Sequence, residues 1–141
     1  MFNDMNDCIF CKIINGDIPS YKIYEDEKVF AFLDILPLSK GHTLVVPKNH
    51  SKDIFDITDE DLCHVMKAIK KISHRIMDIY SPEGIVIRQN NGERAGQSVF
   101  HTHFHIKPVF NGTTVVSEVD HRREISEDEM RGICEDLSMS N

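Results

Sequence analysis

The stretch Val99-Phe-His-Thr-His-Phe-His-Ile-Lys-Pro108 decides how this chain is interpreted. Its aromatic and β-branched residues predict a strand over residues 99–108 that stops at the proline. Side chains alternate between the two faces of a strand, so every second residue shares a face. One face is therefore histidine only: His101, His103 and His105. The other face is expected to turn toward the core: Thr102, Phe104 and Ile106.

Three imidazoles on one face present six ring nitrogens that need partners. A polar, solvent-exposed sheet face is the plain alternative, but such a face has no need for histidine. A metal site is a second interpretation, although His101 and His105 would lie about 13 Å apart on a regular strand, too far to share one ion. Acid–base and nucleophilic chemistry on phosphorus is a third, because imidazole attacks when neutral and donates when protonated near neutral pH.

The flanking sequence predicts a small α+β domain. Thr58 begins a helix that runs to about Tyr80, with apolar residues at spacings of three and four. A short helical turn is expected at 8–16 and a second helix near 126–137. Further strands are expected at 21–25, 28–34, 42–47 and 84–89, the first two as a hairpin. One long helix among short strands indicates an antiparallel sheet of about five strands.

Length and charge limit the possible functions. The 141 residues correspond to one domain, and a net charge of −7 argues against a general nucleic-acid binder. Residues 118–136 hold eight acidic and three basic residues, so the rest of the chain is nearly neutral and can accept a phosphate. No apolar run is long enough to span a bilayer, and the N-terminus lacks a secretory signal. We therefore expect a cytoplasmic protein with reduced thiols and no membrane partner.

Two segments, GHTLVVPKNH (41–50) and NNGERAGQSVFHTHFHIKP (90–108), resemble the histidine triad (HIT) family of nucleotide hydrolases and transferases. The family signature is His-x-His-x-His-x-x with apolar residues between the histidines, from which Thr102 departs. The resemblance extends from about Cys8 to Pro108. It implies a HIT domain over residues 1–110. Residues 111–141 form an acidic extension, which we expect to be helical and packed on the same domain.

The resemblance implies a covalent mechanism. His103 is the implied nucleophile, which attacks the α-phosphorus of a nucleotide to form a nucleotidyl-histidine that water hydrolyses. His105 is implied to contact the phosphate and help the leaving group, and His42 to bond to the triad. The implied phosphate contacts are Asn90, Gln97 and Ser98. Gly96 would let the loop backbone approach the ligand closely, and the loop has neither a Walker A nor a dinucleotide-binding spacing.

The segment around Asp34 resembles the part of the family that holds the nucleoside. Phe32 and Ile35 are implied to contact the base, and Asp34 to accept hydrogen bonds from the ribose hydroxyls. A core position for Phe32 and an exposed turn for Asp34 are the alternatives. The family also implies a preference for purines.

The pair Cys8-Ile-Phe-Cys11 indicates either a metal site or a redox dithiol. A redox pair normally lies in a β-α-β context, which this sequence lacks. Some HIT proteins and the related galactose-1-phosphate uridylyltransferases have a matching zinc-ligand set, which falls here on Cys8, Cys11, His50 and His101. The resemblance thus implies a closed, structural zinc site. The alternative is two reduced thiols with a surface His50.

Taken together, the resemblance implies a homodimeric hydrolase that acts on a purine nucleoside phosphoramidate or a related adenylated compound. Its chemistry is implied to need no cofactor. A dinucleoside polyphosphate hydrolase is the alternative within the family, and one branch of that kind has glutamine at the position of Asn90. A zinc-stabilised nucleotide-binding module without turnover is an alternative of another class. A metal-dependent hydrolase that uses the triad as ligands is a third.

Overall fold

The computed structural model describes residues 7–111 and 124–140. Residues 1–6, 112–123 and 141 lie outside that range, and with them much of the predicted acidic extension. The described helices are α1 (Ile9–Ile14), α2 (Asp59–Tyr80), the short 3-10 turn η2 (Glu93–Ala95) and α3 (Glu127–Leu137). The strands are β1 (Lys22–Glu25), β2 (Val29–Leu33), β3 (Thr43–Pro47), β4 (Gly84–Arg88) and β5 (Phe104–Val109).

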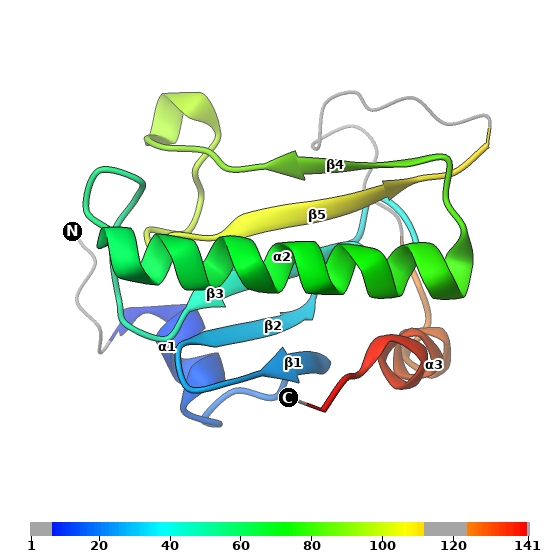
Figure 1. Cartoon of the computed structure of the whole chain (residues 1–141). Helices are drawn as coiled ribbons and strands as arrows, with labels where there is room; N and C mark the ends of the chain where they lie inside the picture. The colour runs from blue at the N-terminus through cyan, green and yellow to red at the C-terminus, as the bar shows by residue number, and fades with distance from the viewer. Residues whose placement is uncertain (1–6, 112–123, 141) are drawn as a thin grey trace.

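The five strands form one antiparallel sheet in the order β1-β2-β3-β5-β4, which confirms the predicted fold class (Figure 1). The predicted hairpin is the β1–β2 pair. Asp26 closes it, because one carboxylate oxygen accepts hydrogen bonds from the backbone N–H groups of Lys28 and Val29, each at 2.8 Å.

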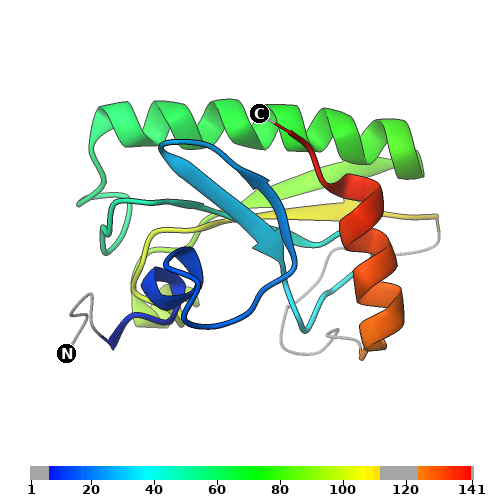
Figure 2. The same ribbon diagram turned by 90° about the horizontal axis from the view of Figure 1, so that it is seen from below.

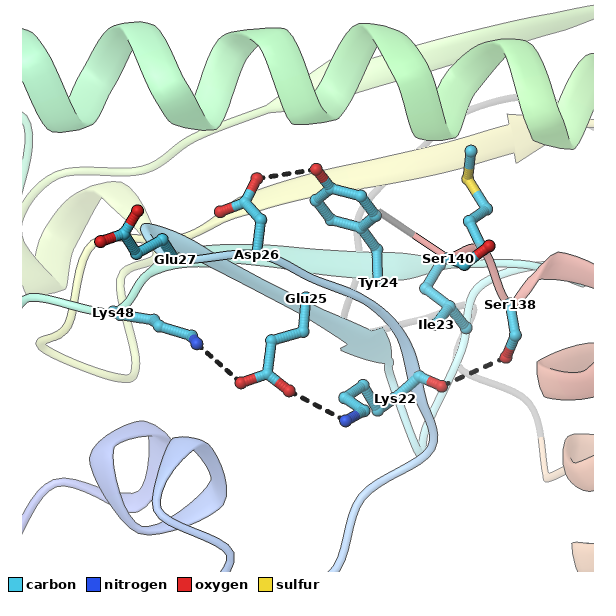
Figure 3. Close-up of a pocket in the computed structure, with 10 residues that line it drawn as sticks. Lys22, Ile23, Tyr24, Glu25, Asp26, Glu27, Lys48, Ser138 and Ser140 are labelled. Atoms are coloured by element: carbon cyan, nitrogen blue, oxygen red, sulfur yellow. Dashed lines mark hydrogen bonds and ion pairs between the residues drawn. The ribbon is translucent and has the colours of Figure 1, made fainter.

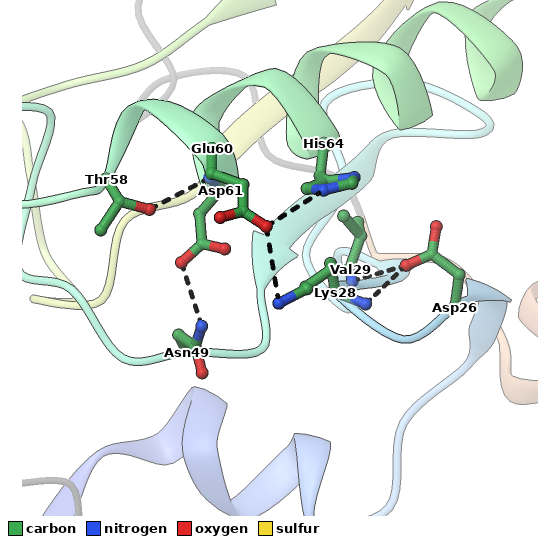
Figure 4. A network of polar contacts seen from close by, with 8 residues as sticks. All are labelled: Asp26, Lys28, Val29, Asn49, Thr58, Glu60, Asp61 and His64. Atoms are coloured by element: carbon green, nitrogen blue, oxygen red, sulfur yellow. Dashed lines mark hydrogen bonds and ion pairs between the residues drawn. The ribbon is translucent and has the colours of Figure 1, made fainter.

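The long helix α2 begins where the sequence predicts. The Thr58 hydroxyl accepts a hydrogen bond from the backbone N–H of Asp61 at 3.1 Å and so caps the first turn. The Asp61 carboxylate in turn accepts from the Asn49 amide at 3.1 Å, and this bond ties the start of α2 to the chain after β3 (Figure 4). Within residues 7–111 and 124–140, no helix combines the length and apolarity that crossing a membrane requires.

Helices cover the two faces of the sheet differently. α2 crosses one face and α1 lies on the other (Figure 2). Alternate residues of β2 serve the two sides, since Val29, Ala31 and Leu33 pack in the cluster under α2, whereas Phe30 and Phe32 pack with α1. The sheet face toward α2 forms the main core, and the candidate site lies on the face toward α1.

The helix predicted near 126–137 is confirmed as α3. Its buried side chains join the main core beside α2 and β1: Met130, Ile133 and Leu137. Beyond it, the Met139 N–H donates to the Ile23 carbonyl at 2.9 Å. The division of the chain into residues 1–110 and 111–141 stays a prediction.

A hollow of about 470 Å³ lies along β1, at the sheet edge far from β5 (Figure 3). The Glu25 carboxylate at its wall pairs with Lys48 at 2.7 Å and with Lys22 at 2.9 Å. The hydrogen bonds from these two ammonium groups hold the pKa of Glu25 below its usual range. The hollow contains none of the predicted site residues, and three of its charged side chains, Lys22, Glu25 and Lys48, pair with one another.

Candidate active site

The histidine segment joins the sheet later than its sequence predicts. β5 begins at Phe104, so the prediction of one regular strand from residue 99 is wrong. The backbone N–H of Thr102 bonds to the Ser51 carbonyl at 2.8 Å instead of to β3. The rings of His103 and His105 lie 5.1 Å apart, whereas the ring of His101 packs against His50 at 5.0 Å.

Hydrogen bonds fix the protonation pattern of His103. Its Nδ1 lies 2.8 Å from the carbonyl oxygen of His101, and a carbonyl only accepts. Nδ1 therefore holds the proton, and the neutral ring keeps a lone pair on Nε2. A lone pair on an oriented, largely buried imidazole is the requirement for a nitrogen nucleophile.

His42 and His105 form a second unit beside it. The backbone N–H of Leu38 donates to His42 Nδ1 at 3.0 Å, so the neutral ring of His42 holds its proton on Nε2. That proton faces His105 Nδ1 at 2.9 Å, which leaves the His105 proton on Nε2. Asp34, His42 and His105 also lie close enough to hold a metal ion, and His42 Nε2 would then bind the ion instead of donating to His105.

Asp34 supports this pair from the end of β2. One carboxylate oxygen accepts from the Leu36 N–H at 2.9 Å, and the other lies 3.6 Å from His42 Nε2. The carboxylate thus faces the Nε2–H group that His42 directs at His105. Sequence reasoning missed this contact, and the predicted contact of Asp34 with a ribose stays a prediction.

Phe10 of α1 connects the predicted base contact to the nucleophile. Its ring meets Phe32 edge-on at 5.5 Å and His103 edge-on at 5.1 Å. Phe32 is buried in this contact, whereas the side chain of Ile35 is 68% exposed beyond the end of the strand. The contacts of both residues with a base stay predictions.

The loop between β4 and β5 is held mainly by Gln97. Its amide oxygen accepts from the Gly92 N–H at 2.8 Å, and its amide nitrogen donates to the carbonyls of Lys52 and Val99 at 2.7 and 3.1 Å. We assign Gln97 to ordering this loop, and a phosphate contact from its side chain stays a prediction. Ser98 is exposed and Asn90 is partly exposed, so both side chains can reach a ligand.

The structure brings together all four residues of the predicted metal set: Cys8, Cys11, His50 and His101. Cys8 caps α1, and the sulfur and nitrogen atoms of the set lie within 4.8 Å of one another. Three of the sulfur–nitrogen distances are 3.4, 3.4 and 3.5 Å. Bonds of about 2.3 Å to sulfur and about 2.05 Å to nitrogen place the ligand atoms of a tetrahedral zinc site about 3.6 Å apart. The cluster therefore fits zinc.

The ring of His101 is already oriented for such a site. Its Nε2–H donates to the Pro47 carbonyl at 2.8 Å, which leaves the lone pair of Nδ1 pointing at the two sulfurs. Burial lowers the pKa of His101 to about 4, so the ring is neutral at physiological pH. Burial, together with the neighbouring Cys8, raises the pKa of the Cys11 thiol to about 12, and a bound cation would have to displace that proton.

Comparison with known proteins decides the family. Residues 15–112 match the HIT domain. The chain belongs to the HIT family. It is 40% identical over 131 residues to the adenosine 5'-monophosphoramidase hnt1 of Schizosaccharomyces pombe, which covers 93% of this chain and 96% of that protein.

Solved HIT structures show the same fold. A Hit-like protein from Bartonella henselae superposes with a TM-score of 0.87 at 34% identity and covers 97% of each chain. A zinc-bound histidine triad family protein from Mycobacterium smegmatis superposes with a TM-score of 0.81 at 34% identity and covers 95% of each chain. The predicted HIT fold is thereby confirmed.

The loop of this HIT domain depends on a glycine whose replacement tests the role of Asn90. Gly96 has φ of +94°, and a Cβ built on it would lie 2.9 Å from the Asn90 amide nitrogen. We expect Gly96→Ala to lower the free energy of unfolding by about 1–2 kcal/mol, because an L-residue is strained there. Displacement of Asn90 should also lower kcat/KM for a nucleotide substrate. Urea unfolding and steady-state kinetics measure the two effects.

Gly132 provides the matched control. It lies within α3, and a Cβ there meets nothing within 4 Å. Gly132→Ala should be neutral or stabilising by up to about 1 kcal/mol, with unchanged kinetics. Equal stability and kcat/KM for Gly96→Ala and the wild type would contradict the assignment of Asn90 to the site.

Proposed function

We propose that this HIT protein hydrolyses a purine nucleoside phosphoramidate or a related adenylated compound through a covalent nucleotidyl-His103 intermediate. The observation behind the proposal is the pair of hydrogen bonds that leaves His103 Nε2 with a lone pair and His105 Nε2 with a proton. A nucleophile and a donor on adjacent rings are the two groups that this reaction needs. The name of the Schizosaccharomyces pombe relative supports the substrate class.

The first step transfers the nucleotidyl group to the protein. His103 Nε2 attacks the α-phosphorus, and a phosphorus–nitrogen bond to the ring forms as the bond to the leaving amine breaks. The amine leaves with its electron pair and takes the Nε2 proton of His105. The pair supplies this proton in a charged form, in which His42 Nδ1 is also protonated and the hydrogen bond from the Leu38 N–H is released. The Asp34 carboxylate, 3.6 Å from His42 Nε2, stabilises that pair while it is charged.

The second step reverses the proton movement. Water attacks the same phosphorus, and its proton goes to His105. The bond between phosphorus and His103 breaks, its electron pair returns to Nε2, and the nucleoside monophosphate leaves. Imidazole suits both steps because it is a good nucleophile and a good leaving group. In this scheme Asn90, the backbone at Gly96 and Ser98 contact phosphate oxygens, and Phe32, Asp34 and Ile35 hold the nucleoside.

A parallel assay of adenosine 5'-phosphoramidate and a diadenosine polyphosphate tests this proposal. We expect faster release of the nucleoside monophosphate from the phosphoramidate. In a single turnover quenched with alkali, label on the α-phosphate should remain attached to the protein in a bond that acid cleaves. Faster turnover of the polyphosphate would favour the other HIT activity. Binding of both compounds without turnover would indicate a nucleotide-binding module.

We also propose that zinc occupies the cluster of Cys8, Cys11, His50 and His101. Its role would be structural, because the protein supplies all four ligands and leaves no open position for a substrate. The zinc-bound Mycobacterium smegmatis structure supports the choice of metal. A cytoplasmic location fits this site, since a reducing compartment keeps both cysteines available as ligands.

A homodimer is the third part of the proposal. Within the described residues no strand pairs with the outer edge of β4, and an open edge strand of one copy can pair antiparallel with the same strand of another around a twofold axis. Beside this edge, Met66 and Met77 of α2 and Ile87 of β4 are exposed around a hollow of about 300 Å³. Apolar side chains next to an open edge favour a second copy as the occupant.

Light scattering tests the dimer. The wild type should have twice the mass of one chain, and Ile87→Glu should have the mass of one, because a carboxylate would be buried in the interface. Ile79→Glu is the control, since Ile79 is similarly exposed on α2 but does not line the hollow. A monomeric wild type, or a dimeric Ile87→Glu variant, would refute this interface.

A further inference from the structure

The nucleophile segment lies outside the strand ladder. The β3–β5 register ends at Val45 and Phe104, and the β4–β5 register ends at Arg88 and His105. His103 therefore precedes the first paired residue of β5 on both sides. The carbonyl of Pro47, at the end of β3, accepts its hydrogen bond from the side chain of His101 and so does not extend the strand ladder toward His103. Some other contact must hold the backbone on which His103 is mounted.

Ser51 and Thr102 provide that contact. The Ser51 carbonyl accepts from the Thr102 N–H at 2.8 Å and from the Thr102 hydroxyl at 3.2 Å, and the two hydroxyl oxygens lie 2.8 Å apart. Ser51 is 5% exposed and Thr102 is fully buried. Buried hydroxyls are retained where they have partners, and these two are partners of each other.

The pair lies next to the proposed metal ligands. Ser51 follows His50 and Thr102 follows His101, so the same two segments are joined once by the cluster and once by the hydroxyl pair. Thr102 also immediately precedes His103, whose Nδ1 bonds to the carbonyl of His101. The hydroxyl pair is thus the side-chain contact directly before the nucleophile, and neither of its residues is a proposed metal ligand.

We propose that Ser51 and Thr102 are positioning residues that hold His103 in the geometry for attack on phosphorus. This inference rests on the proposed function, because it assigns them a role in forming the nucleotidyl-His103 intermediate. It also explains why a polar residue stands between two histidines where the HIT signature usually has an apolar one. A valine there would fill the same space but could not bond to Ser51.

Thr102→Val removes the hydroxyl and keeps the size and the backbone bond. A misplacement of about 1 Å can cost about 100-fold in rate, so we expect kcat to fall roughly 10- to 100-fold with KM within about 2-fold. Thr102→Ser keeps the hydroxyl and should retain kcat within about 3-fold. Tyr24→Phe is the control, since it removes a hydroxyl that donates to Asp26 at 2.7 Å, on β1 and away from the site. All variants are assayed in zinc-containing buffer.

The double variant Ser51→Ala/Thr102→Val separates positioning from stability. Removing both hydroxyls leaves no unpaired buried oxygen, so its melting temperature should recover toward the wild type. A positioning role predicts that kcat stays low. Recovery of kcat together with the melting temperature, or an equal loss of kcat in Tyr24→Phe, would overturn the proposal.

The ring signals of His103 in the NMR spectrum test the same proposal without turnover. The signals are identified by their loss in His103→Asn. In free Thr102→Val they should shift or broaden, whereas in Tyr24→Phe they should be unchanged. If the wild type forms no nucleotidyl adduct, the proposed function fails, but this measurement still decides whether the hydroxyl pair of Ser51 and Thr102 positions His103. Unchanged His103 signals in Thr102→Val would refute it.

Discussion

Replacing His103 with asparagine should reduce turnover of a nucleoside phosphoramidate by at least about 1,000-fold. Asparagine can still donate to the His101 carbonyl, so the local backbone is preserved, but it has no lone pair that can form a bond to phosphorus. The covalent adduct should therefore be absent in a quenched single turnover. Nucleotide affinity, measured by calorimetry, should change little, because His103 is one wall of a site with several other contacts.

His64→Asn is the matched control for this variant. His64 lies on α2, on the other side of the sheet from α1, where it faces Glu60 at 3.9 Å. Its kinetics should match those of the wild type. If His103→Asn retained a substantial part of the activity or still formed an adduct, another group would be the nucleophile, and the proposed mechanism would be wrong.

Removal of zinc is the second large effect that we expect. A ligand bound at a thousandfold excess over its Kd stabilises the folded state by about 4 kcal/mol, so chelation should lower the melting temperature by roughly 10 °C or more. The physical reason is that a metal bound by the cluster would join α1 to the chain after β3 and to the chain before β5. Cys11→Ser should reproduce the effect without chelator, and metal analysis should give one zinc per wild-type chain and little in the variant.

Cys63→Ser distinguishes this effect from general thiol loss. Cys63 is exposed on α2 and is not part of the cluster, so its replacement should change neither metal content nor melting temperature. Substitution with cobalt gives an independent readout, because thiolate ligands produce a sulfur-to-metal absorption band. A wild-type protein that holds no metal, or one whose melting temperature is insensitive to chelator, would refute the zinc site.

Local sequence patterns predicted the elements that depend on local forces. The helix expected from Thr58 to Tyr80 is α2, because its cap, its apolar stripe and its stop all lie within the helix itself. The strands at 42–47 and 84–89 begin and end within one residue of β3 and β4. Period-two alternation also placed Phe104 and Ile106 correctly in the core.

The start of β5 could not be predicted, because it depends on contacts with distant parts of the chain. Residues 99–103 have the composition of a strand, but Ser51 and Pro47 take up the hydrogen bonds of Thr102 and His101. Strand propensity describes a preference that such tertiary contacts override.

The sequence predicted the side chains of the candidate site but not the groups that hold them in place. His42, His103 and His105 are brought together as expected, as are the four residues of the metal cluster. The Leu38 N–H that orients His42 is a backbone group and has no sequence signature. Phe10 could have been noticed, because it is an apolar residue enclosed by the cysteine pair. Its contact with His103 is visible only in three dimensions.

The alternation along β5 has a consequence for how this chain can change in length. Phe104 and Ile106 belong to the core under α2, whereas His105 between them bonds to His42. Inserting or deleting a single residue here would exchange the core-facing and site-facing residues of β5. Histidine would then lie in the hydrophobic core and phenylalanine in the candidate active site. Insertions and deletions can therefore be tolerated in the connecting loops, whereas β5 can change only by substitution of one residue for another.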